Sequence, residues 1–457
     1  MPRPTSLAAG AAALLALTAC AGAREEQVRQ ALAATPPPLA LTETATTAAA
    51  DLPARLEAGL AGQLAVAMER NPELQAAFHR WRASVLRISR ARRLPEPVLG
   101  FGLFVSAVET RVGPQRARLG LSQTFPWPTR LTAGADAAAA EARAQARRFD
   151  ALALAVGRRV TEGYWRLWVI RQNRATHTQH LEVLRALSES ARARVATGAT
   201  ALADQQQVDL AVARLQDLLR GMDEAERATA AQLRATLGVP PGTPLPTPGE
   251  PPQASLPTES DAAMAAEARA HPAVEALTLG AEAKDALARA ESAERLGGLT
   301  LSADWIITGA NGTGLPEDGK DAVVVGAGLK VPLWQGSYGE AVAAAEAEAT
   351  AQRADARAAA DQAEAELEGA LSAVRDAARR VQLHRATLVP QAESALESVL
   401  GAYATGRGTV AQGLLAQRDL LDLRVELDRA RAEHAIQWAR LEQVVGHAVE
   451  RAPLEAP

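Results

Sequence analysis

Two histidines are the residues whose spacing first suggests metal chemistry. His177 and His180 stand three positions apart in a stretch that reads as a long helix. At this spacing both imidazoles lie on one side of a helix and could share a metal ion. The chain has seven histidines and four methionines, and the others are too scattered to complete a ligand set. We therefore expect solvent-facing polar residues here, with no metal site and no cofactor.

Other patterns that could support chemistry are equally incomplete. Gly309, Gly312 and Gly314 form a loose glycine pattern, but Pro316 follows them and no helix begins there, so we interpret the segment as a loop. No Ser/His/Asp, Cys/His or paired-carboxylate arrangement stands out, and we expect no catalytic residue and no enzyme. The net charge of -4, without a basic domain, argues against nucleic acid as a partner.

The N-terminus carries an export signal. Arg3 is followed by an apolar stretch from Leu7 to Leu17, which is too short to span a bilayer and fits a signal peptide over residues 1–19. The segment "LTAC" ending at Cys20 resembles a bacterial lipoprotein box, so we expect Cys20 to be acylated, to anchor the chain in lipid and to begin a linker over residues 20–50. Cleavage after the "AGA" of residues 21–23 is the alternative.

The chain contains one structural unit twice. "RNPELQAAFHRWRAS" is answered by "AHPAVEALTLGAEAK", "SQTFPWPTR" by "GLKVPLWQG", and "VATG" by "YATG", always in the same order. We assign the first repeat to residues 51–238 and the second to residues 259–447. A proline-rich connector, residues 239–258, joins them in an extended conformation, and residues 448–457 form a C-terminal tail.

Each repeat contains two alternating segments that predict β-strands. They lie at about residues 98–106, 116–125, 299–308 and 322–331, with apolar residues on one face and polar or small residues on the other. The length and alternation fit strands of a membrane β-barrel, although a half-buried soluble sheet gives the same pattern. No later apolar run is long enough for a transmembrane helix, so a membrane crossing would have to use strands.

Long helices complete each repeat. Residues 129–197 contain no proline and residues 337–405 contain only Pro390, so we predict a coiled-coil-length helix in each. Each helix ends at an Ala-Thr-Gly and a second helix follows. We also predict helical structure over residues 51–93, with Asn71-Pro72-Glu73 as a capped helix start, and this segment together with residues 200–237 would match one long helix in length. Four strands cannot close a barrel, so we expect oligomers, and we favour a trimer with twelve strands over a dimer with eight.

The chain resembles the TolC-like outer-membrane efflux proteins, and within them the lipoprotein partners of metal-exporting RND pumps. "RNPEL", "LSQTFPWPTR", "LKVPLWQG" and the two "ATG" breaks carry this resemblance. It implies a mainly helical homotrimer in which a twelve-stranded β-barrel in the bacterial outer membrane continues into a periplasmic α-helical barrel. It also implies docking to a periplasmic adaptor protein and an inner-membrane RND pump, with the helical turns forming the contact and the gate.

The resemblance assigns these roles to particular positions. The tip, docking and gate residues would be Thr197, Gly198, Asp204, Tyr403, Thr405, Gly406, Gln412, Leu414 and Leu415. Many members place aspartates just after the second turn, whereas this chain has Gln412 and Leu415 there. Trp127 and Trp334 occupy matching places after the strand pairs, where core packing and a membrane-interface position are both open.

The sequence therefore predicts an exit duct for metal ions or small toxic compounds. A duct for type I polypeptide secretion is an alternative with the same architecture. A periplasmic coiled-coil scaffold without a pore is the third possibility.

Overall fold

The computed structural model describes residues 23–35, 51–198, 201–312, 314, 317–405, 407 and 409–454. Cys20, Gly406 and the expected signal peptide lie outside these residues. The chain divides into two compact units. The first, here called the strand unit, comprises Met1–Pro36, His79–Arg147 and Glu275–Arg357, and the second, the helical unit, comprises Pro37–Phe78, Arg148–Val274 and Ala358–Pro457. Each unit therefore takes segments from both repeats.

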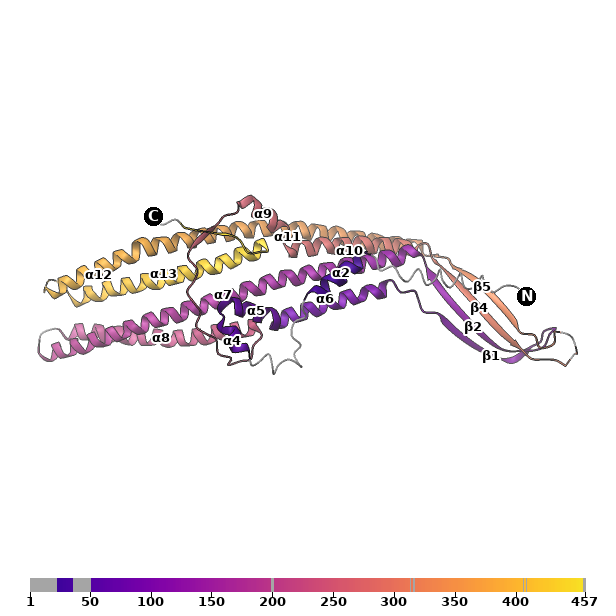
Figure 1. Ribbon diagram of the computed structural model, residues 1–457, viewed down its shortest axis with the longest axis horizontal. Coiled ribbons are helices and arrows are strands. Elements are labelled where there is room, and N and C mark those ends of the chain that lie inside the picture. Colours follow the sequence, from indigo (N-terminus) through magenta and orange to yellow (C-terminus); the bar gives the residue numbers. More distant parts are fainter. Residues whose placement is uncertain are drawn as a thin grey trace. The chain divides into compact units, whose positions relative to one another are not determined.

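The strand unit contains a four-stranded antiparallel sheet. Its strands are β1 (Val98–Val108), β2 (Gln115–Pro126), β4 (Gly298–Thr308) and β5 (Ala322–Lys330), which lie side by side in the order β1-β2-β4-β5 (Figure 1). The two hairpins meet through β2 and β4, where Gly120 lies opposite Asp304 and Ser122 opposite Ser302. One sheet is thus assembled from both repeats.

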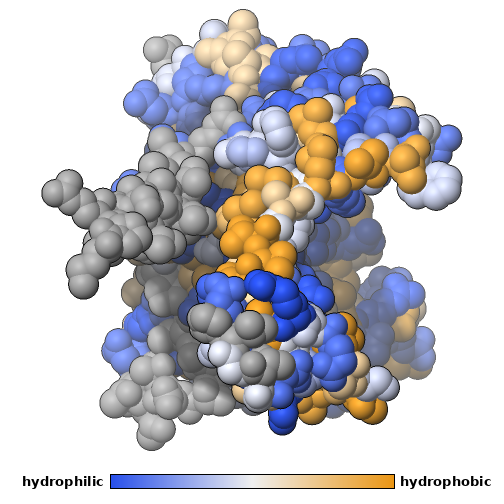
Figure 2. Space-filling model, turned by 90° about the vertical axis from the view of Figure 1, so that its right-hand side faces the viewer, coloured by the Kyte–Doolittle hydropathy of each residue, from blue (hydrophilic) through white to orange (hydrophobic). Residues whose placement is uncertain are grey.

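One face of this sheet is apolar and open to its surroundings. Val105 is 100% exposed, Val325 80% and Leu99 71%. Viewed from the side on which the strands lie in Figure 1, the molecule shows a band of hydrophobic side chains between hydrophilic ones (Figure 2). Alternation places these residues on the face opposite Gly100, Gly120 and the serines. Exposed apolar area of this kind requires a partner or a lipid surface.

The opposite face is small and polar and holds one ion pair. Arg118 donates from Nε and Nη2 to the two carboxylate oxygens of Asp304, at 2.9 and 2.8 Å. A Cβ at Gly120 would run into this carboxylate, so glycine leaves the space that the pair occupies. The pair links β2 of the first repeat to β4 of the second.

Helices adjoin the end of the sheet at which β1 and β4 begin and β2 and β5 end (Figure 1). α2 (Ala23–Ala34) is held against α6 (Pro72–Ala91) by Arg29, whose Nη2 donates to Ser89 Oγ at 2.8 Å. α10 (Pro272–Glu294) is bound to the first part of α7 (Pro128–Ala196) by ion pairs such as Arg143–Glu282 at 2.9 Å. The contact between α7 and α10 joins the two repeats within the strand unit.

The helical unit contains the remaining helices. They are α4 (Leu52–Glu57), α5 (Gly59–Arg70), α8 (Leu202–Leu237), α9 (Asp261–Arg269), α12 (Val389–Ala404), α13 (Val410–Val445) and the later parts of α7 and α11 (Gln335–Leu383). A short sheet pairs β3 (Ser255–Pro257) with β6 (Arg451–Pro453). None of the described helices has both the length and the apolar composition of a membrane span.

The expectation that residues 51–93 form one continuous helix is wrong, because the segment forms α4, α5 and α6, whereas the predicted helix start at Asn71 is confirmed. Gly59 adopts a φ of +77°, and Asn71 takes an extended conformation. The Asn71 side chain accepts from the backbone N–H groups of Glu73 and Leu74 at 2.9 and 3.0 Å and donates to the Thr236 carbonyl at 2.8 Å. This cap starts a new helix and at the same time binds the end of α8.

The long helix expected over residues 337–405 is interrupted once. A π-helical turn, His384–Leu388, lies between α11 and α12 and immediately precedes Val389 and Pro390. Proline lacks the N–H group that would bond to the carbonyl four residues earlier, and a wider turn accommodates its ring. The chain thereby remains helical through a residue that normally ends a helix.

Several clusters of buried residues form the core of the helical unit, and three of them show how the helices pack. The first packs α5, α7 and α8 through residues such as Val66, Val160 and Leu233, and the second packs α9, α11 and α13 through Met264, Leu367 and Trp438. The third joins the repeats, because Tyr164, Trp165 and Trp168 of α7 pack on Ala432 and Ala435 of α13. Small alanines opposite large aromatics let these two helices approach closely.

Candidate functional site: the helical turns and the connector

The turn between α7 and α8 is exposed and lightly built. Thr197 caps the end of α7 by donating from Oγ1 to the Arg194 carbonyl at 3.0 Å. Gly198 follows with a φ of +73°, and a Cβ built there would have no atom within 4 Å. Glycine is therefore required at position 198 only for its backbone conformation and not for lack of space. Asp204 lies in the first turn of α8, where an acid is favoured by the helix dipole.

The turn between α12 and α13 uses a different start signal. Thr405 donates from Oγ1 to the Ala402 carbonyl at 3.0 Å, as Thr197 does in the first turn. Thr409 then accepts from the Gln412 backbone N–H at 3.3 Å, while the Gln412 side chain accepts from the Thr409 backbone N–H at 3.0 Å. This reciprocal capping box fixes the beginning of α13.

Gln412 has a structural role at the start of α13. Gln412 occupies one of the places where an aspartate was considered, and its side-chain oxygen is used by the helix start. The sequence Thr409-x-x-Gln412 is the capping signature, so this role was readable from the sequence and was missed.

Leu414 and Leu415 point to different surroundings. Leu414 packs against a small cluster of Leu181, Leu184 and Leu215 from the first hairpin, whereas Leu415 is 57% exposed. The two hairpins therefore touch near their turns through Leu414. Leu415 remains available for another surface. Tyr403 lies in the last turn of α12.

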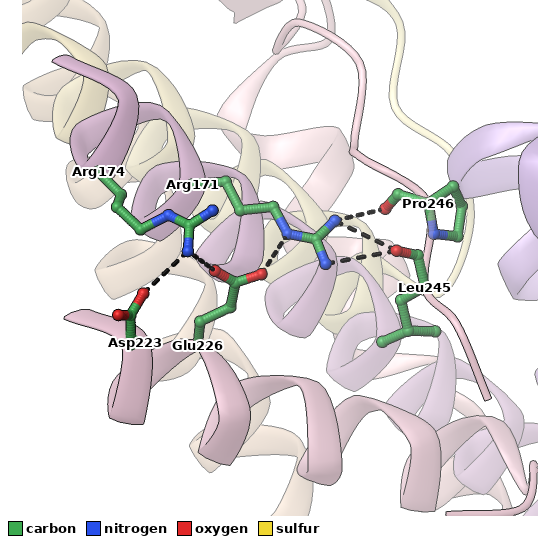
Figure 3. Close-up of polar contacts among 6 residues, drawn as sticks. All are labelled: Arg171, Arg174, Asp223, Glu226, Leu245 and Pro246. Carbon is green, nitrogen blue, oxygen red and sulfur yellow. Dashed lines mark hydrogen bonds and ion pairs between the residues drawn. The ribbon is translucent and has the colours of Figure 1, made fainter. Parts of the chain in front are cut away.

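The connector is fastened to the helices rather than free. Arg171 of α7 donates to the carbonyls of Pro246 at 2.8 Å and Leu245 at 3.3 Å, and its Nε donates to Glu226 of α8 at 2.8 Å (Figure 3). Arg174, one turn further on, pairs with Asp223 at 2.8 Å. Arg171 thus satisfies two carbonyls that a proline-rich segment cannot pair internally.

The connector then crosses from the first hairpin to the second. Tyr164 of α7 accepts from the Gly249 backbone N–H at 3.1 Å, and Arg431 of α13 pairs with Glu250 at 2.6 Å. His434 Nε2 lies 2.9 Å from the Ser255 carbonyl, and burial lowers the pKa of His434. Through these contacts the connector binds both α7 and α13.

The expectation that His177 and His180 face solvent is wrong for His177, which is 6% exposed. Burial lowers the pKa of both histidines, and the nearby Asp422 carboxylate only partly offsets that effect. His177 is buried because α7 packs against other helices on more than one side, so even a polar position of α7 can be covered.

A second group of possible ligands lies where α9 and α13 end. Glu259, Glu267 and His447 place ligand atoms within 4.8 Å of one another. His447 Nδ1 lies 2.9 Å from the Ala448 carbonyl and Nε2 lies 2.8 Å from Glu267. Both partners accept, so both ring nitrogens donate, and these contacts raise the pKa of His447. Both ring nitrogens are thus occupied by contacts within the protein, so we assign no metal here.

Trp127 and Trp334 are 47% and 76% exposed, each just after a strand of the strand unit. Core packing therefore does not account for their positions in this chain, which leaves the membrane-interface interpretation as a proposal.

Known proteins share this fold. Residues 265–447 match the family described as outer membrane efflux protein. Among solved structures, the outer membrane protein VceC from Vibrio cholerae aligns with a TM-score of 0.70 at 21% identity, covering 86% of this chain and 97% of that one. CusC aligns with a TM-score of 0.72 at 14% identity, over 85% and 92%. The open state of the MtrE outer membrane channel from Neisseria gonorrhoeae aligns with a TM-score of 0.69 at 16% identity, over 85% and 89%. No curated protein matches the chain in sequence.

Proposed function

We propose that this chain, which has the fold of the TolC-like outer-membrane efflux proteins and matches their family over most of its second repeat, forms the exit duct of a tripartite efflux system. Three copies would join their sheets in the bacterial outer membrane, and the helices would extend into the periplasm. An adaptor protein and an inner-membrane RND pump would deliver metal ions or small toxic compounds to the duct.

The apolar, exposed face of the four-stranded sheet carries this proposal. Within the described residues, β1 and β5 each pair with one strand only, so each presents an open edge. In lipid, unpaired backbone groups cost several kcal/mol each, so a sheet of four strands needs further copies to close on itself. Three copies supply twelve strands, enough to enclose a passage rather than a packed interior.

We propose the two helical turns as the adaptor contact and the gate. Thr197, Gly198 and Asp204 would form one turn of each copy, and Thr405, Gly406 and Leu415 the other. Leu414 would couple the two turns, because it packs against the cluster of the first hairpin.

We propose that acylated Cys20 anchors each copy, and that Trp127 and Trp334 lie at the membrane interface. A mature N-terminus at Arg24 would overturn the anchor, and mass spectrometry of the purified chain measures it.

Deletion of the gene tests the proposed function. We expect hypersensitivity to some of zinc, cobalt, copper and organic toxicants, restored by the native chain. Loss of a secreted polypeptide without any change in sensitivity would instead favour a type I secretion duct. A protein extracted as a monomer without channel activity would leave only the scaffold.

A further inference from the structure

The helical unit has two different faces. On α13, Leu427, Arg431 and His434 contact or adjoin the connector, whereas Arg429 and Ile436 line a hollow of about 890 Å³. Arg429 stands two residues from both Leu427 and Arg431, which is about 200° around a helix. The hollow therefore lies on the side of α13 away from the connector.

α7 shows the same division. Tyr164 and Arg171 bond to the connector, while Arg166 and Val169 line the hollow. Arg166 and Val169 are each two positions from a connector-binding residue, about 200° around the helix. Four helices thus form a layer with the connector on one face and the hollow on the other, because α8 and α11 also contribute residues to the hollow.

The hollow is lined by apolar side chains, here called its floor, and by charged side chains among which the arginines outnumber the carboxylates. Its floor includes Val169, Ile170, Ala373, Ala377, Leu383 and Ile436. Four arginines line it, namely Arg166, Arg379, Arg380 and Arg429, together with three carboxylates, Asp376, Glu426 and Glu433. The volume lies in the range of small-molecule sites.

Most of the charges in the hollow are already paired. Asp376 is bound by Arg379 at 2.6 Å and by Arg380 at 2.8 Å. Glu426 contacts His384 at 3.1 Å, and Arg166 pairs with Glu162. Arg429 makes no hydrogen bond or ion pair with any residue that the structure describes, so it is the cation left to bind an anion.

We propose that this hollow faces the passage of the duct and binds an amphipathic organic anion, a molecule with a rigid apolar body and a carboxylate or sulfonate. Arg429 binds the anionic group and the apolar floor receives the body. The hollow does not favour a bare metal cation, because its four arginines outnumber its three carboxylates. The inference rests on the proposed duct and names the class of its cargo.

Binding and conduction are measured separately to test this. Cholate, a rigid amphipathic carboxylate, is dialysed to equilibrium against the full-length protein in lipid nanodiscs, with empty nanodiscs subtracted. We expect saturable binding that Arg429→Gln weakens about tenfold or more, and that Arg429→Lys largely restores. Arg220→Gln is the matched control, because Arg220 is exposed and lies about 180° around α8 from Thr229 of the hollow. We expect this control to bind cholate as the native chain does.

Several outcomes would overturn the inference. These are equal weakening by Arg429→Gln and Arg220→Gln, no saturable cholate binding, or equally tight binding of the cation tetraphenylphosphonium. A hollow covered by a second copy would also overturn it, shown by protection of a Thr229→Cys thiol from a sulfonated maleimide. Conductance in planar bilayers reports on the duct itself. Cholate binding without conductance would refute the duct but support the binding site. Conductance without cholate binding would support the duct but refute the binding site.

Discussion

Arg171 donates a hydrogen bond to the carbonyl oxygen of Pro246 at 2.8 Å, joining residues 75 positions apart. The same guanidinium binds Glu226, and both side chains are only about one-fifth exposed. Arg171→Gln should therefore loosen the connector by about 2 kcal/mol, because hydrogen bonds of a charged group are lost and Glu226 keeps only the longer contact to Arg174, at 3.6 Å. Cleavage of the connector by proteinase K should become about thirtyfold faster.

Arg174→Gln is the control for this prediction. Its side chain is 46% exposed and pairs with an equally exposed Asp223. An exposed pair contributes less than about 1 kcal/mol, so we expect at most a few-fold change. Equal cleavage of both variants would show that Arg171 does not hold the connector.

The start of α13 should depend on Gln412. Gln412→Ala removes one side of the capping box and should destabilise the first turn by about 1 kcal/mol. Amide hydrogen exchange near Leu414 and Leu415 should rise about fivefold. Gln412→Glu keeps an oxygen at the same position and should preserve protection. Unchanged exchange in the alanine variant would contradict the assigned cap.

Two glycines with similar backbones should respond differently to alanine. Gly198 and Gly238 have φ values of +73° and +68°. A Cβ at Gly198 meets nothing within 4 Å, so Gly198→Ala should cost only about 1–2 kcal/mol of backbone strain. At Gly238 the Cβ would run into the Arg70 carbonyl, so Gly238→Ala should cost clearly more. Thermal unfolding of both proteins measures this, and a larger loss in the Gly198 variant would be contrary to the account.

Asp428 should make stability depend on pH. Its side chain is 14% exposed, and burial raises its pKa to about 6, with Arg431 lowering it and Glu250 raising it. A raised carboxyl pKa gives stability that is complete below the unfolded value of 3.8 and is lost as the pH rises through about 6. Asp428→Asn removes this term, so its stability relative to the native chain should rise by about 2 kcal/mol between pH 4 and pH 7.

Asp217→Asn is the control for this prediction, because Asp217 lies on the exposed surface of α8. Its pH profile should follow that of the native chain. Thermal unfolding is recorded from pH 4 to pH 8. If Asp428→Asn also follows the native profile, the burial of Asp428 does not make the stability depend on pH.

The sequence predicted a mainly helical fold like that of outer-membrane channels, and the structural comparisons confirm that fold, while residues 265–447 match the outer membrane efflux protein family. The trimer and its closed twelve-stranded barrel stay predictions. Strands were predictable because their two-residue period is local: β1 and β4 lie within two residues of the alternating segments. The break at Gly59 was not predictable, because glycine is tolerated within helices and only the φ of +77° shows its role.

Long-range contacts explain what the sequence left out. The sequence predicts an extended conformation at Pro246, but it does not predict that Arg171 binds the Pro246 carbonyl. His177 looks polar and is buried only because α13 packs nearby. The hollow lined by Arg429 is likewise formed by four helices from two repeats. No local sequence pattern specifies how these helices are rotated relative to one another.

Electron cryomicroscopy of the particle extracted from the outer membrane tests the central claim most directly. The account predicts three copies around one axis, with twelve strands in a closed sheet surrounding a passage that continues between the helices. A single copy, or an assembly without a passage along its axis, would contradict it.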